Sequence, residues 1–230
     1  MSQPRAAHRN RPEICGRLDS IGGIAARRSY NAPQRRRDIA DAAIVLLGSD
    51  GAHGLSHPRV DQKAGLPAGT TSYHFPTRQA LVHGIAERIT ELDVADLALA
   101  AGLDADGDGD GHFSGTLGFA RLVMFSATDP GLTRARARHE LALAARRDPD
   151  LAATMSKVTT QIYGLARDVV AGWTDDRPPA DVETIEERAV TVLTYVSGVM
   201  LSFVYGRPAV TDAHDLDRHI RAMLSGLAAQ

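Results

Sequence analysis

The sequence is poor in cysteine, in aromatic residues and in long apolar runs. Its single cysteine, Cys15, excludes an internal disulfide framework. Aromatic residues make up only 5% of the chain while alanine and leucine are abundant, a composition that favours helices over sheets. No apolar run approaches the ~20 residues that cross a bilayer, and the N-terminal arginines are not followed by an apolar segment with a cleavage site. We therefore expect a cytoplasmic, all-α protein that does not contact a membrane.

Lysine is also scarce, and the basic residues are unevenly distributed. Residues 1–90 carry 13 Lys and Arg against 7 Asp and Glu, a net charge of +6, whereas the remainder carries 13 against 21, a net charge of −8. A basic front and an acidic back suit a polyanion-binding head on a body that does not touch the polyanion. Arginine runs also occur on solvated faces, so this distribution supports nucleic-acid binding only together with a binding motif.

Signatures of catalysis and of metal binding are missing as well. No Ser/His/Asp arrangement, glycine-rich phosphate loop or paired-carboxylate motif is present. The acidic run Asp104–Gly111 has no glutamate at the twelfth position of either possible EF-hand register, so we interpret residues 102–115 as a flexible acidic loop. We therefore expect neither an enzyme nor a cofactor. We also expect no metal site, because the histidines of the C-terminal part lack metal-ligand spacing: His112, His139, His214 and His219.

The segment Gly54–Arg78 carries the signals of two short helices joined by a turn. We expect the first helix to begin behind Ser56, whose hydroxyl caps the free N–H groups, and to stop at Gly65 in a left-handed cap. The second helix is expected to restart around Pro67-Ala68 and to carry small and polar residues. Such a pair predicts a helix-turn-helix, whose second helix enters the major groove of DNA.

These residues resemble the TetR family of bacterial transcription regulators. The matching positions are Gly54-Leu55-Ser56, Ala64 to Thr70, His74-Phe75 and Arg78, and the preceding helix also fits, so that the resemblance covers roughly residues 34–81. It implies an N-terminal three-helix helix-turn-helix DNA-binding domain at 34–80 and a larger C-terminal helical ligand-binding and dimerisation domain at 81–230.

Residues 1–33 mix Pro, Arg, Gly and Ser without sustained periodicity. We interpret them as a flexible basic N-terminal tail. The alternative is a basic arm in which Arg27, Arg28 and Arg35–Arg37 touch phosphates or the minor groove.

Apolar residues recur at helical spacing through the rest of the chain. A first helix at about 34–50 is expected to bury Ile39, Ala42, Ala43, Leu46 and Leu47, and to end at Asp50-Gly51. Thr77 is expected to cap a fourth helix that runs to about Ala100 and buries Leu81, Ile85, Ile89 and Leu92. The remaining helices are expected at 114–127, 131–147, 150–173, 181–206 and 212–228. With the four before them, the chain should form about nine helices.

The resemblance implies which side chains meet the DNA. Ala68, Gly69, Ser72 and Tyr73 stand where family members reach base edges or the adjacent backbone, and Tyr73 can equally place its hydroxyl on a phosphate. Thr71 and Phe75 are expected to pack inward. The residues expected to bind DNA are Arg37, His57, Arg59, Ala68, Gly69, Thr70, Ser72, Tyr73, His74 and Arg78.

Two positions depart from the family pattern. Pro58 stands where many relatives have a basic residue, and Ser72 stands where many have tyrosine. Both departures bear on the sequence of the operator rather than on whether DNA is bound.

The last two helices, 181–206 and 212–228, carry more apolar surface than one core-facing stripe requires. By the resemblance they form a four-helix bundle across a two-fold axis; the alternative is that they bury only into their own core. Residues expected at the dimer interface are Val192, Val196, Val199, Met200, Phe203, Ile220 and Leu224, with Ser197 and Gly198 allowing close approach. Residues expected at a ligand pocket, although each also suits a plain core, are Phe119, Val123, His139, Leu143, Tyr163 and Trp173.

The sequence therefore predicts a ligand-responsive, homodimeric transcription regulator. We expect a repressor that holds a palindromic double-stranded DNA operator and is released by a small, largely apolar effector. The alternatives are a DNA-binding regulator without a small-molecule effector and, from another class, a small all-helical enzyme.

Overall fold

The computed structural model describes residues 31–105, 115–173 and 181–227. The tail with Cys15, Arg27 and Arg28, most of the acidic loop and the loop at 174–180 lie outside these residues. Within them every regular element is a helix, so the predicted all-α class is confirmed. Nine helices are present in this part of the chain: α1 (Ala32–Gly54), α2 (His57–Lys63), α3 (Thr70–His74), α4 (Arg78–Ala105), α5 (Gly115–Met124), α6 (Gly131–Ala145), α7 (Pro149–Ala171), α8 (Val182–Val204) and α9 (Ala213–Leu227).

Helix α1 begins and ends close to its predicted bounds. Its apolar stripe faces inward, with Ile39, Ala43, Leu46 and Leu47 buried, while Ala42 is half-buried. The helical geometry breaks at Gly51, whose φ of 68° is easily adopted only by glycine, and one further turn follows before Gly54.

The turn between α2 and α3 differs from the sequence prediction in two details. Ser56 is the N-cap of α2 with an extended backbone, but its side chain makes no capping hydrogen bond, so the expected hydroxyl cap was wrong. Gly65 takes the left-handed conformation as predicted, with φ 63°. Helix α3 begins at Thr70 and not at Pro67-Ala68, because Gly69 before it has φ 88° and interrupts the helical backbone.

Helix α4 leaves the helix-turn-helix and runs into the body. The Thr77 hydroxyl oxygen accepts the Ala80 N–H at 3.0 Å, which confirms the predicted cap. Leu81, Ile85 and Ile89 are buried on one face, and the helix continues to Ala105, about a turn and a half beyond its predicted end.

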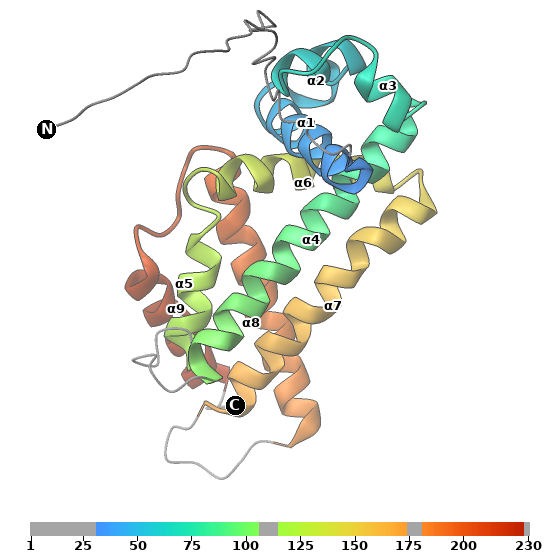
Figure 1. Ribbon diagram of the computed structural model, residues 1–230. Coiled ribbons are helices and arrows are strands. Elements are labelled where there is room, and N and C mark those ends of the chain that lie inside the picture. Colours follow the sequence, from blue (N-terminus) through green and yellow to red (C-terminus); the bar gives the residue numbers. More distant parts are fainter. Residues whose placement is uncertain (1–30, 106–114, 174–180, 228–230) are drawn as a thin grey trace, which may run out of the picture. The chain divides into compact units, whose positions relative to one another are not determined.

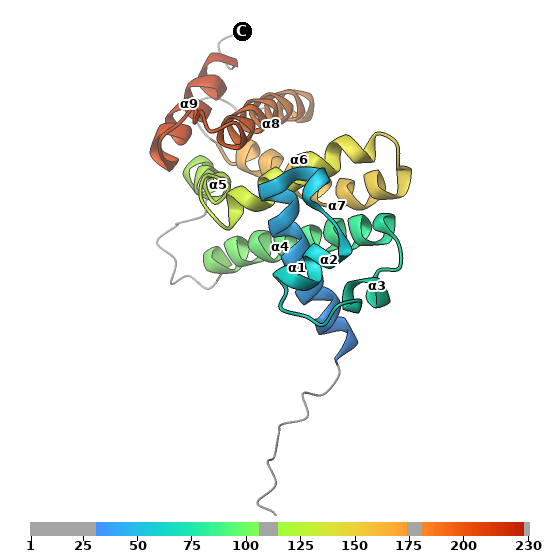
Figure 2. The ribbon, with the colours of Figure 1, turned by 90° about the horizontal axis from the view of Figure 1, so that it is seen from above.

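Figures 1 and 2 show the arrangement of these helices. Two hydrophobic clusters hold them together. The first joins α1, α2, Phe75 and the first half of α4 to residues of α6 and α7, namely Ala137, Leu141 and Leu151. The second joins α5, the second half of α7, α8 and α9. The helix-turn-helix therefore completes its core with residues that lie far along the chain.

Helix α8 is long and apolar enough, by length and composition, to cross a membrane, which the sequence analysis did not anticipate. In this fold it packs along α7 and also contacts α9. Its side chains Val192, Val199 and Phe203 are buried in the second cluster, and the Tyr195 hydroxyl lies 2.6 Å from His219 Nδ1 on α9.

Helix α1 packs extensively against α6 of the body (Figure 2). At Gly48 a Cβ atom would lie 2.3 Å from the carbonyl oxygen of Thr133 on α6. Thr133 is itself fixed, because its N–H and hydroxyl both donate to the Asp129 carboxylate. Only glycine at position 48 allows this contact between the two backbones.

Replacing Gly48 by alanine should therefore destabilise the protein by about 1–3 kcal/mol, because the added methyl group must push α1 away from α6. Gly164→Ala on α7 is the matched control, since its added methyl group would have no neighbouring atom within 4 Å and alanine favours a helix. Urea unfolding of both variants measures the difference. Equal stability of the two variants would contradict the close packing of α1 on α6.

Candidate nucleic-acid interface and internal cavity

Helix α3 is only five residues long, and a buried carboxylate fixes it to α2. Asp61, 4% exposed, accepts the Gly69 N–H at 2.8 Å through Oδ2. Its Oδ1 accepts the Thr71 N–H at 2.7 Å and the Thr71 hydroxyl at 2.5 Å. Burial alone raises the pKa of Asp61, but the hydrogen bonds from Thr71 and Gly69 outweigh it and leave the pKa below its usual value. The ionised carboxylate thus sets where α3 begins.

The other end of α3 is held by α1 and α4. Phe75 is 1% exposed and lies so close to Gly84 that a Cβ there would meet its ring at 2.3 Å. Arg36 of α1 stacks its guanidinium 4.1 Å from the centre of the Phe75 ring and donates to the His74 carbonyl at 2.6 Å. Sequence reasoning predicted inward packing of Thr71 and Phe75, which is confirmed.

The sequence analysis missed Asp61, and it considered Arg36 only as part of a possible basic arm at DNA, not as a support for Phe75 and His74. In the sequence, a charged residue at position 36 or 61 looks like an ordinary surface residue. Only in the folded chain does Asp61 come within hydrogen-bonding distance of the Gly69 N–H. The one available signal was that Asp61 directly follows the buried Val60 on a short helix.

Anchoring at both ends leaves one side of α3 and of the turn before it open to solvent. Ala68, Gly69 and Ser72 are exposed, and Tyr73 is 74% exposed, with its ring edge-on to His74. These residues therefore share one surface. It presents a tyrosine, a hydroxyl and bare backbone, groups that suit contacts in a DNA groove.

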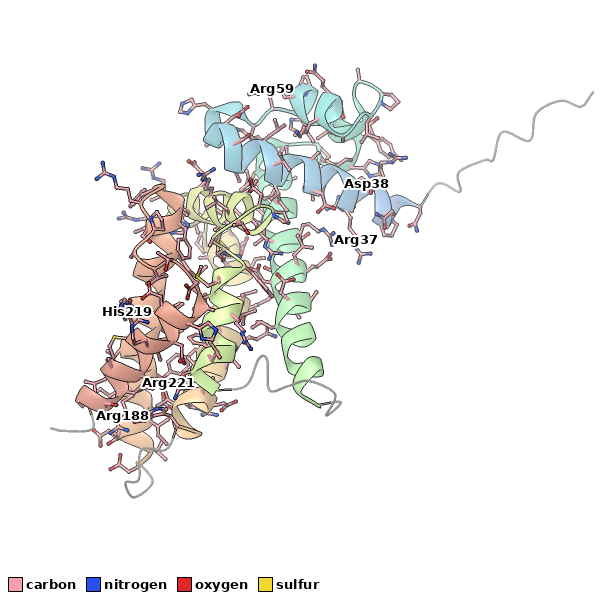
Figure 3. All side chains as sticks on the ribbon, turned by 90° about the vertical axis from the view of Figure 1, so that its left-hand side faces the viewer. Arg37, Asp38, Arg59, Arg188, His219 and Arg221 are labelled. Atoms are coloured by element: carbon pink, nitrogen blue, oxygen red, sulfur yellow. The ribbon has the colours of Figure 1, made fainter. Side chains whose placement is uncertain are left out.

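Most of the remaining residues expected at DNA make contacts within the chain. His57 Nε2 lies 2.7 Å from the Phe75 carbonyl oxygen, and the Thr70 hydroxyl donates to the Pro67 carbonyl at 2.6 Å. The arginines also donate hydrogen bonds within the chain. Arg78 donates to the Ala52 carbonyl at 2.6 Å, and Arg37 donates to Glu91 at 3.3 Å. Arg59 donates to the Gly54 carbonyl at 2.9 Å and to Asp50. In Figure 3, Arg37 is labelled on α1 and Arg59 on α2. Arg188 is labelled on α8, and His219 and Arg221 on α9.

The charge of the described head is smaller than that of the whole N-terminal region. Residues 32–81 carry six basic and four acidic side chains, so much of the +6 of residues 1–90 belongs to residues 1–31, outside the described part of the chain. The pKa of His74 is lowered, first by burial and then by Arg36 and Arg35, which keeps this imidazole neutral near pH 7. His74 therefore suits a hydrogen bond to a phosphate rather than an ion pair.

The body contains a cavity of about 300 Å³ between α4, α6, α7 and α8. Most of its wall is apolar, and its polar residues include His139, Asp93 and Arg138. A smaller cavity of about 90 Å³ adjoins it, because Asp93, Arg138 and Met200 line both. The two cavities together offer an elongated apolar space with one charged wall.

Three of the six residues expected at a ligand pocket lie at these cavities. His139 lines the larger one, and Phe119 and Val123 line the smaller one. The other three lie elsewhere: Leu143 is 68% exposed, Tyr163 donates its hydroxyl hydrogen to Glu186, and Trp173 packs against the second cluster.

The charged wall is a cluster of two aspartates on α4 and two arginines on α6. Arg138 Nη2 donates to both carboxylate oxygens of Asp93, at 2.7 and 2.6 Å. Arg134 Nε lies 3.3 Å from Asp93, and Arg134 also pairs with Asp96. Sequence reasoning found none of these four, although their spacing of three residues on α4 and four on α6 places each pair on one helical face. No cluster that could hold a metal ion occurs in the described parts of the chain.

The residues expected at a dimer interface require a correction. Six of them are at most 4% exposed, and Met200 is half-buried against the second cluster, so this face of α8 and α9 packs into the chain's own core. The outward face of α8 instead presents Val190, which is 51% exposed, followed by Thr194, Ser197 and Gly198. That face has room for a neighbour, because nothing lies within 4 Å of a Cβ built at Gly198. The prediction differed because it assigned to a dimer interface the apolar residues that pack into the core of the single chain.

Comparison with known proteins agrees with this architecture. Residues 118–230 match the family model of the tetracyclin repressor-like C-terminal domain. No protein of curated function matches the sequence.

Solved structures resemble most of the described chain. A member of the TetR family from Streptomyces coelicolor A3 is 26% identical, with a TM-score of 0.55, and the match covers 85% of this chain and 98% of that one. A transcriptional regulator from Rhodococcus sp. Rha1 shares the fold at 19% identity, with a TM-score of 0.63, over 84% of this chain and 96% of that one. The multidrug binding protein EbrR complexed with ethidium is 23% identical, with a TM-score of 0.56, over 84% and 98%.

Replacing Asp61 by asparagine should destabilise the protein by about 1–3 kcal/mol at pH 7, because the amide turns one acceptor into a donor that faces an N–H group. The pKa of Asp61 is lower in the folded protein. Its stabilising effect is therefore complete above the unfolded-state pKa of about 3.9 and is lost as the pH falls through the folded-state value.

Urea unfolding from pH 7 to pH 3 measures this effect, and the gap between wild type and D61N should narrow below about pH 4. Asp168→Asn is the control, because Asp168 is exposed and pairs with the neighbouring Arg167 on the surface. A gap that is the same at every pH would refute the role of the ionised carboxylate.

Proposed function

We propose that this chain, which belongs to the TetR family of transcription regulators, acts as a homodimeric repressor whose hold on DNA responds to a small molecule. Two observations together carry the proposal. Helix α3 is anchored at both ends while its outer surface is exposed. The next helix, α4, forms one wall of an apolar cavity. Such a regulator works in the cytoplasm, where the DNA is, and needs no catalytic group.

The exposed surface of α3 supports DNA readout by few side chains. Ser72 and Tyr73 are the side chains of this helix that reach outward, while Ala68 and Gly69 let the phosphate backbone approach closely. Arg37, Arg59 and Arg78 are the basic residues that we propose to meet the phosphates. Their contacts within the chain fix their positions, so little side-chain freedom is lost when DNA binds.

A dimer is required by the small size of this reading surface. One five-residue helix reads few base pairs, and two heads related by a two-fold axis read a palindrome whose half-sites lie about 34–36 Å apart or a multiple of that. We assign the interface to the outward face of α8 with Val190, Thr194, Ser197 and Gly198. We extend the proposed interface to α9, where Ala222, Ser225 and Gly226 are small and exposed.

The effector is assigned to the larger cavity. Its volume of about 300 Å³ equals roughly ten water volumes at ~30 Å³ each, which suits a compact, largely apolar molecule. The effector must bind the released state of the protein more tightly than the DNA-bound state, because equal affinity shifts no equilibrium. The cavity favours this function over that of a regulator without a small-molecule effector.

A mobility-shift titration against the DNA flanking the protein's own gene tests the proposal. We expect tight binding that weakens steeply as salt is added, because phosphate contacts release counterions. No binding to generic DNA even at low salt would overturn the assignment of α1–α3 to DNA.

In the same assay Tyr73→Ala should weaken binding to the operator by about 5- to 150-fold while leaving binding to generic DNA nearly unchanged, since a lost groove contact costs about 1–3 kcal/mol. Lys157→Ala removes an exposed side chain from α7 and serves as the control. An unchanged operator affinity of Y73A would remove Tyr73 from the readout.

The dimer assignment is tested by placing arginine at two helical glycines. Both Gly198 on α8 and Gly164 on α7 have open space around a Cβ, so the single chain can accommodate either substitution. We expect G198R to sediment as a monomer and G164R as a dimer in analytical ultracentrifugation. A dimeric G198R would place the interface elsewhere.

A further inference from the structure

The geometry points to an effector that is an amphiphilic anion, with an apolar body in the larger cavity and an acid group bound by Arg138. This inference rests on the proposed function, because it names the chemical class of the molecule that the cavity takes. It follows from which hydrogen-bonding groups of the charged wall are already used.

Arg138 has donors to spare. Its guanidinium lines both cavities, yet only Nη2 has partners in the described parts of the protein, both of them oxygens of Asp93. Nε and Nη1 carry three further N–H groups for which the described residues provide no acceptor. Since the side chain is only 27% exposed, an anion at these groups would form charge-assisted hydrogen bonds in surroundings of low polarity.

The Asp93 carboxylate, which lines both cavities beside Arg138, is in contrast largely occupied. The Asp93 side chain is 10% exposed and is already paired with Arg138 and Arg134. A ligand cation at Asp93 would have to displace one of these guanidinium groups and leave it partly buried without its partner, at a cost of several kcal/mol. An anion can instead be added without breaking either pair.

The apolar part of the wall defines the rest of the ligand. The rest of the wall is formed mainly by apolar side chains such as Ile89, Leu141, Val158 and Leu193, so the body of the ligand should be hydrocarbon. A carboxylate with a chain of about ten carbon atoms fits the volume.

Anion binding at Arg138 also has a consequence for the head. The Arg138–Asp93 pair joins α6 to α4, and α4 begins at Arg78, directly after the helix-turn-helix. A second anion on the same guanidinium repels Asp93 and weakens this connection. The effector thus acts on the helix that carries α3.

Isothermal titration calorimetry with three probes of equal chain length tests the charge of the effector: decanoate, 1-decanol and decylammonium. We expect decanoate to bind at least tenfold more tightly than 1-decanol, and decylammonium to bind more weakly than both. In Arg138→Gln the affinity for decanoate should fall at least tenfold, while that for 1-decanol stays the same. Arg136→Gln is the matched control, because Arg136 lies on the same helix but lines neither cavity.

Three results would overturn the inference: no binding of decanoate, binding of decylammonium or ethidium in preference to decanoate, or equal loss of decanoate affinity in R138Q and R136Q. Thermal unfolding of both variants shows whether they fold. The mobility shift separates this inference from the proposed function. If the protein binds DNA but does not prefer decanoate, only the inference of an anionic effector is refuted. If it prefers decanoate but does not bind DNA, the proposed regulatory function is refuted and the anion site remains.

Discussion

The position of the helix-turn-helix depends on a hydrophobic core that it does not complete by itself. Ala137 and Leu141 of α6 and Leu151 of α7 belong to the same buried cluster as Ile39 and Val60 of the head. Helices α1 to α3 supply too little apolar surface to form an independent core of this size, so the body fixes their orientation. A change in the body therefore reaches the head through close-packed side chains, which shift between discrete arrangements rather than deforming smoothly.

Helix α6 is the element through which such a change would pass. At one point its backbone touches α1, where Gly48 meets the Thr133 carbonyl. Arg134, the next residue, and Arg138, just over one turn further along, line the cavities and hold Asp93 on α4. The same short helix therefore contacts the head, the cavity and the helix that carries α3. An effector in the cavity needs to disturb only these contacts in order to change the geometry of the reading surface.

The sequence was sufficient to predict the helices and the inward packing of Thr71 and Phe75, but not the contacts that orient α3. Helical periodicity predicted the buried face of α1, and the glycine at position 65 predicted the end of α2, because both signals are local. The role of Asp61 depends on a turn that folds Gly69 and Thr71 over its carboxylate, a contact between residues that share no helical face. The pairing of Arg138 with Asp93 spans 45 residues and leaves no trace in local spacing.

The two faces of α8 show why apolar character alone could not separate core from interface. Val192, Val196 and Val199 lie inside, whereas Val190, Thr194 and Gly198 lie outside. Valine therefore occurs on both faces, and only the packing of the folded chain shows which valines belong to its core. Val196 and Met200 also line both cavities. Since these residues alternate with the outward ones on one rigid helix, a ligand that shifts Met200 also shifts Gly198, and the cavity and the proposed dimer interface are coupled through α8.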